Sequence, residues 1–210
     1  MFIELIDQLR CLEWHDETWL VATLHRQHER FVRTGILGCP ICFREYAIAH
    51  GVAYFGVTPP EERPRPVTTD DPNMAIRAAA WLNASERSTH VLAGRWAPHA
   101  HAVTAMLPLR IFAVNPSVPM DDSEMVGVIE TSDRIPLGMM SVNGVALDEA
   151  TATPSVMASA VRILAQNGRL VAPVSVPVPA DVQEIARDDV YWVGQVTHVA
   201  ASGLVPLQRK

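Results

Sequence analysis

Long apolar runs and cysteine are both scarce in this sequence. The most apolar late stretch, residues 170–178, is interrupted by Pro173 and Pro177, whereas a membrane-spanning helix needs about 20 predominantly apolar residues. Three cysteines are too few to suggest a disulfide framework, and the sequence opens without a basic and apolar signal segment. We therefore expect no membrane insertion and a reducing, cytoplasmic setting.

Basic charge is also limited, since 17 Lys and Arg face 23 Asp and Glu for a net charge of −6. Nucleic-acid backbones recruit proteins through clustered positive charge, so the composition disfavours a nucleic-acid partner. The arginines near the N-terminus still support a nucleic-acid-binding module as a third functional hypothesis; they are Arg26, Arg30, Arg33 and Arg44. Phosphate-cradling GxxxxGK and metalloprotease HExxH motifs are absent.

The composition is that of a folded chain, with 49% hydrophobic residues, 19% charged residues and a mean hydropathy of +0.11. A length of 210 residues accommodates a small module and a medium-sized domain. The proline-dense, charged segment that begins at Thr58 is typical of an extended linker. We predict a module over residues 1–57, a linker over 58–72 and a second domain over 73–210.

Hydrophobic periodicity and turn residues indicate the secondary structure. In the first module the sequence predicts helical segments over 1–12 and 17–33 and a hairpin over 43–55. After the linker it predicts helices over 73–83, 98–106, 154–166 and 182–192, and strands over 89–93, 110–114, 125–130, 142–147, 169–176 and 198–208. Alternation of this kind is the signature of an α/β layer structure.

A CxxC pair formed by Cys39 and Cys42 provides half of a structural zinc site. The other half should lie upstream, where Cys11 is followed by Trp14 at the position of a second thiolate. His15, one residue later, can supply a nitrogen ligand. These four residue types predict zinc bound by Cys11, His15, Cys39 and Cys42.

Two alternatives to this ligand set remain open from the sequence. His25 or His28 could replace His15 as the nitrogen ligand. Alternatively, the ribbon has lost its metal, and Cys39 and Cys42 are small buried residues packed around Trp14.

The first quarter of the chain resembles the short zinc-ribbon proteins that activate methyltransferases. The resemblance rests on residues 5–11 and 38–52, in which the CxxC pair is followed by a hairpin containing Tyr46, Ile48 and Gly51. The sequence departs from the pattern at Trp14. Because such activators cover apolar surface on a methyltransferase, the resemblance implies that this module packs on the second domain of its own chain.

Residues 73–210 are similar to class I S-adenosylmethionine-dependent methyltransferases in the order of their predicted elements. Residues 142–149 resemble the fourth strand of that family, 161–171 its following helix and turn, and 203–210 its last strand. The resemblance implies an α/β fold with a Rossmann-like sheet, helices on both of its faces, and S-adenosylmethionine as the cofactor.

The residues expected to hold that cofactor are altered. The family has a glycine-rich turn after its first strand, but Gly94 is the only glycine of the turn here, and glycine is what allows the close backbone approach. Asn115 replaces the carboxylate expected at the end of the second strand, and Asp133 remains as an acid near the expected adenine position. Gly94, Asn115 and Asp133 are therefore the candidate cofactor-binding residues.

These changes favour a non-catalytic binding or scaffold protein derived from a methyltransferase, with another protein or a second copy as partner. The alternative is an active methyltransferase with a diverged pocket that acts on RNA, protein or a small molecule. Retained cofactor binding would favour the alternative.

Overall fold

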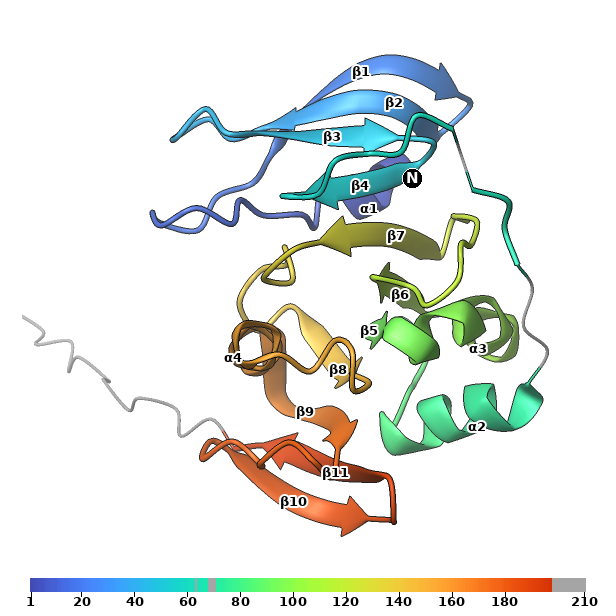
Figure 1. Ribbon diagram of the computed structural model, residues 1–210, viewed down its shortest axis with the longest axis vertical. Helices are drawn as coiled ribbons and strands as arrows, with labels where there is room; N and C mark the ends of the chain where they lie inside the picture. Colours follow the sequence, from blue (N-terminus) through green and yellow to red (C-terminus); the bar gives the residue numbers. More distant parts are fainter. Residues whose placement is uncertain (63, 68–70, 198–210) are drawn as a thin grey trace, which may run out of the picture.

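The computed structural model describes residues 1–62, 64–67 and 71–197 (Figure 1). Its N-terminal part contains α1 (Ile3–Ile6), β1 (Val21–His28), β2 (Phe31–Gly38), β3 (Glu45–Ala49) and β4 (Val52–Phe55). The later elements are α2 (Pro72–Trp81), β5 (Thr89–Ala93), the 3-10 helix η1 (Gly94–His99), α3 (Ala100–Met106), β6 (Arg110–Val114), β7 (Val126–Thr131), β8 (Val142–Ala146), α4 (Pro154–Ile163), β9 (Leu164–Pro173), β10 (Val182–Arg187) and β11 (Tyr191–Val196).

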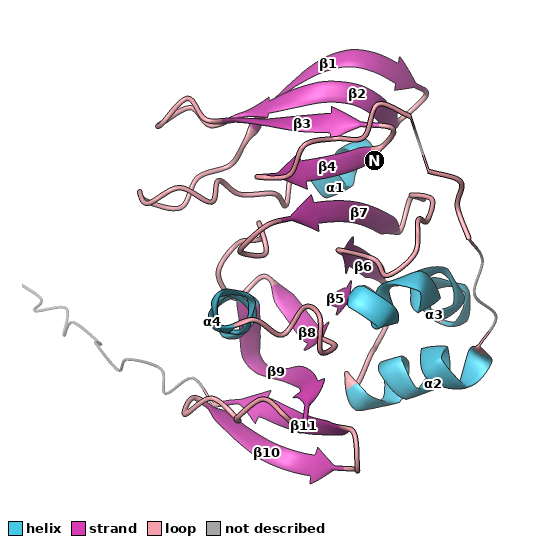
Figure 2. Cartoon of the chain, in the orientation of Figure 1, coloured by secondary structure: helices cyan, strands magenta, loops and turns pink. Residues whose placement is uncertain are grey.

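The eleven strands form one continuous sheet in the order β1-β2-β3-β4-β7-β6-β5-β8-β9-β11-β10 (Figure 2). From β7 to β9 all neighbouring strands are parallel. Counted along this part of the chain, their order is third, second, first, fourth and fifth, as in a doubly wound sheet. The antiparallel hairpin β10–β11 then pairs with β9 through β11. The predicted Rossmann-like sheet is confirmed.

Helices cover both faces of this sheet (Figure 1). Along β5, Val91 and Ala93 belong to the core that contains α1 and α4, whereas Leu92 belongs to the core under α2, η1 and α3. A strand covered on both faces is largely apolar. Every residue of β5 is buried, and its last three residues are apolar. Among the described residues, no helix is long and apolar enough to cross a bilayer.

The start of α2 illustrates how local sequence sets an element. The side chain of Asp71 accepts hydrogen bonds from the N–H groups of Asn73 and Met74 at 3.0 and 3.3 Å, and Pro72 occupies the first helical position. Proline needs no N–H partner at that position, and an aspartate cap satisfies the free N–H groups of the first turn. This Asp-Pro pair is the signal that predicted a helix over 73–83.

The N-terminal strands continue the sheet of the later part. β4 pairs in parallel with β7, from Val52 opposite Val128 to Phe55 opposite Thr131. Asp122, whose side chain is 1% exposed, accepts from the α-ammonium group of Met1 at 2.7 Å and from Arg33 Nη1 at 2.6 Å. The two parts therefore share one core, and the division into 1–57, 58–72 and 73–210 stays a prediction.

The helix expected over 17–33 is wrong, because this segment forms most of the β1–β2 hairpin. β1 is an edge strand whose side chains are almost all exposed, so its sequence carries no alternating apolar pattern. Gly35 permits the close pairing, since a Cβ atom there would lie 2.7 Å from the carbonyl oxygen of Thr23. The helix expected over 1–12 is limited to α1, because Leu9 and Arg10 form bridges to later residues.

The helix expected over 182–192 is also wrong, because the segment forms β10 and the turn into β11. Asp188 Oδ1 accepts from the N–H groups of Val190 and Tyr191 at 2.8 and 2.7 Å, which fixes the turn. Gly194 lies opposite Glu184 and diagonally across from Val182, and a Cβ atom there would come within 2.3 Å of Val182 Cγ1. The closing strand expected over 198–208 lies outside the described residues.

Candidate functional site

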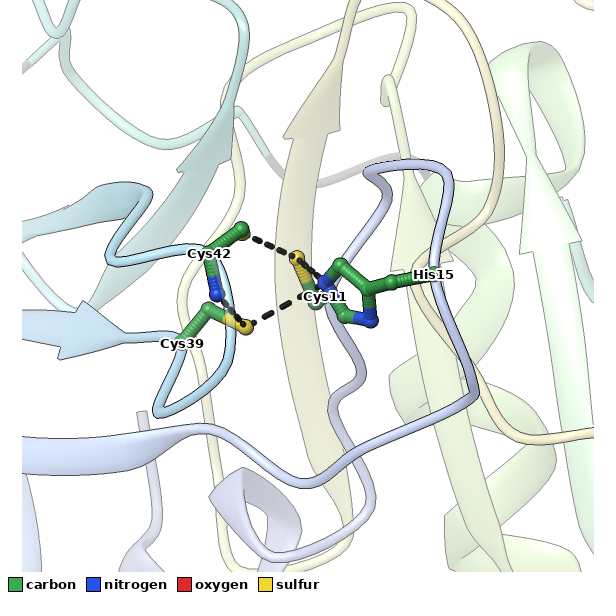
Figure 3. Close-up of side chains that lie close together, drawn as sticks. All are labelled: Cys11, His15, Cys39 and Cys42. Atoms are coloured by element: carbon green, nitrogen blue, oxygen red, sulfur yellow. Dashed lines mark hydrogen bonds between the residues drawn. The ribbon is translucent and has the colours of Figure 1, made fainter.

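Two loops bring Cys11, His15, Cys39 and Cys42 together (Figure 3). Cys11 and His15 lie on the segment between α1 and β1, and the CxxC pair forms the turn between β2 and β3. The turn is closed by hydrogen bonds from Phe43 N–H to the Cys39 carbonyl at 3.0 Å and from Cys39 N–H to the Arg44 carbonyl at 2.9 Å.

The ligand atoms of the four side chains lie within 4.8 Å of one another. The two sulfur atoms of Cys11 and Cys42 are 3.6 Å apart, and His15 Nε2 lies 3.2 Å from Cys11 Sγ and 3.3 Å from Cys39 Sγ. Tetrahedral zinc, with bonds of about 2.3 Å to sulfur and 2.0 Å to nitrogen, separates its ligands by roughly 3.5 to 3.8 Å. The donor set and its spacing fit zinc.

Surrounding groups orient these ligands. His15 Nδ1 lies 2.7 Å from the carbonyl oxygen of Asp16, a contact that leaves Nε2 facing the cysteines. The Tyr46 hydroxyl accepts from Leu12 N–H at 3.1 Å and lies 3.4 Å from Cys11 Sγ, so its proton can point to the sulfur. Tyr46 thus supports the ligand Cys11, whereas the sequence indicated only that Tyr46 belongs to the hairpin.

The thiols of the half-buried Cys11 and the buried Cys39 differ in acidity. Burial raises the pKa of the Cys11 thiol to about 11. Burial also raises the pKa of Cys39, but hydrogen bonds from the N–H groups of Cys42 and Ile41 outweigh it and bring the value to about 7. Since the thiolate is the form that binds metals, Cys39 is the better prepared ligand of the two.

Neither sequence alternative matches this arrangement. His25 and His28 lie exposed on β1 and are not members of the cluster. Trp14 is 91% exposed and stacks under the guanidinium of Arg134, whose carbon lies 4.9 Å from the ring centre. The interpretation in which the cysteines pack around Trp14 is therefore wrong, because that ring is on the surface.

The turn after β5 is occupied by a side chain from another strand. Gly94 is buried and has a φ of +58°, and a Cβ atom there would lie 2.2 Å from both carboxylate oxygens of Asp148. Asp148 Oδ2 accepts from Arg95 N–H at 2.8 Å, and Oδ1 accepts from the N–H and hydroxyl of Thr151 at 3.0 and 2.7 Å. The carboxylate thus packs against the backbone that glycine leaves open.

The side chain of Asn115 forms hydrogen bonds with the backbone of Thr131. Its Nδ2 donates to the carbonyl of Thr131 at 2.9 Å, and its Oδ1 accepts from Thr131 N–H at 2.7 Å. The side-chain amide therefore ties the end of β6 to the end of β7. The following loop reaches the turn after β5, since Ser117 N–H donates to the Gly94 carbonyl at 3.1 Å.

Asp133 lies on the loop after β7, where its N–H donates to Thr131 Oγ1 at 3.4 Å. It is exposed and forms an ion pair with Arg134 at 3.4 Å. It lines a surface hollow that also includes Trp14, Arg44 and Tyr46, beside the Cys/His cluster. The structure therefore brings Asn115 and its loop toward Gly94 but places Asp133 near the metal ligands.

Comparisons with known proteins give structural neighbours only. No family model matches the chain, and no curated protein matches it. A complex between the Trm112 methyltransferase activator of Haloferax volcanii and a methyltransferase is 17% identical, with a TM-score of 0.44 over 60% of this chain and 89% of that chain.

Two further neighbours are methyltransferases. Geranyl diphosphate C-methyltransferase from Streptomyces coelicolor is 14% identical, with a TM-score of 0.38 over 48% of this chain and 44% of that chain. Phosphoethanolamine N-methyltransferase 2 of Haemonchus contortus is 10% identical, with a TM-score of 0.38 over 48% of this chain and 27% of that chain. The present chain spans less than half the length of these two proteins.

Proposed function

We propose that this protein is a non-catalytic binding protein in which a zinc-holding ribbon is joined to a methyltransferase-like α/β sheet. The observation that carries the proposal is the position of Asp148, whose carboxylate lies against Gly94. A cofactor that approached this turn, as the methyltransferase resemblance implies, would need the backbone surface that Asp148 covers.

Displacing Asp148 would be costly. Its side chain satisfies the N–H groups of Arg95 and Thr151, and the residue is only 6% exposed. A buried group left without its partner costs about 1 to 3 kcal/mol. Asn115 adds to the argument, because its amide is engaged by Thr131 and carries no charge for a ribose.

A surface suited to a protein partner lies on the two ligand-bearing loops. Trp14, Phe43 and Ile41, here called the knuckle surface, are 91%, 81% and 51% exposed. Two of them, Trp14 and Ile41, line the same shallow hollow beside Cys42. Exposed apolar clusters mark interaction sites, and tryptophan is enriched among the residues that dominate binding.

Zinc would give this surface its shape. The ligands Cys11 and His15 come from one loop and Cys39 and Cys42 from the other, so the metal would tie the loops together. Four protein ligands complete a tetrahedral site and leave no position for substrate, which is the pattern of structural zinc. Binding of a partner should therefore depend on the metal.

Titration of the zinc-loaded protein with S-adenosylmethionine tests the loss of catalysis. We expect no heat at millimolar cofactor, for the wild type and for Asp148→Asn, which keeps the volume of the side chain. Micromolar binding together with transfer of a labelled methyl group would overturn the proposal in favour of a diverged active methyltransferase.

A matched pair of variants tests the binding role. The double substitution Trp14→Ser and Phe43→Ser should abolish retention of a specific partner, or dimerisation seen by sedimentation, while the zinc content stays the same. Trp19→Ser is the control, since Trp19 is 64% exposed but lies outside the knuckle surface. Retention that is equal in both variants would contradict the assignment of this surface.

A further inference from the structure

A second cavity, separate from the metal ligands, has the chemistry of an anion site. It has a volume of about 320 Å³ and lies between α2, η1 and the start of β11. Its lining residues are Met74, Arg77, Arg95, His99, Val190 and Tyr191. Small-molecule pockets begin at about 300 Å³, so the space suits a compact ligand.

Two arginines, Arg77 and Arg95, supply positive charge to this cavity. Among the described residues, no carboxylate oxygen comes within 4.0 Å of the Arg77 or Arg95 guanidinium. The closest acids act at longer range: Asp188 on Arg77, and Asp148 and Glu149 on Arg95. Asp71 likewise acts on His99 at longer range, so the two guanidinium groups keep their donors available for a ligand.

Buried polar groups lie beside the two arginines. His99 is 7% exposed, and its Nδ1 has no hydrogen-bond partner among the described residues. Tyr191 is 3% exposed, and within the described part of the chain its hydroxyl has no partner at hydrogen-bond geometry. Its proximity to Arg95 raises the pKa of that guanidinium. Buried polar atoms without partners are rare in folded proteins and point to a ligand.

Aromatic packing holds these groups in place. The rings of Trp81, Trp96 and Tyr191 pack against one another with centroids 5.0 to 6.0 Å apart. The Arg77 guanidinium carbon lies 4.8 Å from the centre of the Trp81 ring. A guanidinium stacked on an aromatic face loses less freedom when it binds an anion, so the site is prepared before the ligand arrives.

We propose that this cavity binds the phosphate group of a small phosphorylated molecule, with Arg77 and Arg95 as the cationic ligands and Tyr191 and His99 as hydrogen-bonding groups. Two guanidinium groups carry two positive charges, so they complement a phosphate dianion better than they complement a carboxylate with one negative charge. Their planar donors also suit phosphate oxygens. The small volume of the cavity and the chain's net charge of −6 disfavour a polymeric nucleic-acid backbone. The site does not rest on the proposed function.

Calorimetry on the full-length protein tests the site with inorganic phosphate, pyrophosphate and phenyl phosphate as probes, and with chloride at matched ionic strength as a screening control. We expect binding of at least one phosphate probe and none of chloride. Preference for phenyl phosphate identifies a phosphorylated small molecule as the ligand, whereas preference for inorganic phosphate identifies the free ion. No heat from any phosphate probe at about 10 mM overturns the proposal.

Variants locate the binding. Arg77→Ala and Arg95→Ala should each weaken phosphate binding by about tenfold or more, the effect of one charge-assisted contact. Tyr191→Phe removes only the hydroxyl and should weaken it by a smaller factor. Arg110→Ala is the matched control, because Arg110 is an exposed arginine at the start of β6 and does not line the cavity. Affinity that is unchanged in both Arg77→Ala and Arg95→Ala would refute the assignment, and circular dichroism verifies that the variants fold.

Discussion

Gly94 and Asp148 occupy adjoining space at the ends of neighbouring strands, so that a Cβ atom at Gly94 would meet both carboxylate oxygens at 2.2 Å. This contact gives the glycine a structural purpose. Its φ of +58° also lies in the region that favours glycine. The packing of Asp148 thus accounts for a glycine at position 94 without a bound cofactor.

Gly94→Ala should destabilise the protein by about 2 kcal/mol or more, because it adds both backbone strain and a clash with Asp148. Urea denaturation followed by circular dichroism measures the free energy of unfolding. Gly38→Ala is the control, since a Cβ atom there meets nothing closer than the Val21 carbonyl oxygen at 3.8 Å. Equal stability of the two variants would show that Asp148 moves aside easily.

The Cys/His cluster predicts a metalloprotein. The purified protein should contain about one zinc ion per chain, and its removal by a chelator should lower the Tm, since structural zinc contributes folding energy. Cys39→Ser and His15→Ala should reduce the zinc content measured by mass spectrometry. His25→Ala should leave it unchanged, because His25 is exposed on β1. A full complement of zinc in His15→Ala would exclude His15 as a ligand.

Much of the sheet was predictable from local pattern. β5 and β6 have the bounds expected from the sequence, Thr89–Ala93 and Arg110–Val114, because each ends in a short apolar run. The two wrong helices, over 17–33 and 182–192, share a physical cause. β1 and β10 are the opposite edges of the sheet, and their exposed side chains lack the alternation that marks a half-buried strand.

The metal ligands could be predicted from the sequence, but the contact between Asp148 and Gly94 could not. The residues Cys11, His15, Cys39 and Cys42 stand out by type and spacing, and the structure places their ligand atoms together. The contact of Asp148 with Gly94 could not be read in the same way, because it depends on the pairing of β5 with β8. The available signal was a carboxylate that follows an adjacent parallel strand.

The N-terminal strands should be tied energetically to the rest of the sheet through Asp122. Asp122→Ala would leave Arg33 and the α-ammonium group of Met1 without their carboxylate, and loss of one partner from a buried ion pair costs about 3 kcal/mol or more. Chemical denaturation measures this loss. Glu124→Ala, an exposed acid in the same loop, should change the stability by less than about 0.5 kcal/mol. A loss of comparable size in both variants would contradict a specific role for Asp122.

Stability should also fall in acid because of His90, which is 2% exposed. Its Nε2 lies 2.8 Å from the Ser88 hydroxyl oxygen, which itself donates to the Ser85 carbonyl. Its Nδ1 has no partner among the described residues and lies where a Cβ atom at Gly144 would come within 2.7 Å. A proton on Nδ1 would find no acceptor there, and burial lowers the pKa of His90 to about 4.

The direction of the pH effect follows from the different pKa values of His90 in the folded and the unfolded protein. Between the unfolded value near 6.5 and the folded value of about 4, the unfolded chain binds the proton more readily. The stability contributed by neutral His90 is therefore complete above pH 6.5 and decreases as the pH falls, by about 3 kcal/mol once the pH is below 4. Burial lowers the pKa of His99 as well, which adds in the same direction. Urea denaturation at several pH values should show a shallower decrease for His90→Gln than for the wild type. His101→Gln, at an exposed position, should follow the wild-type curve, and identical slopes for all three proteins would exclude His90 as the titrating group.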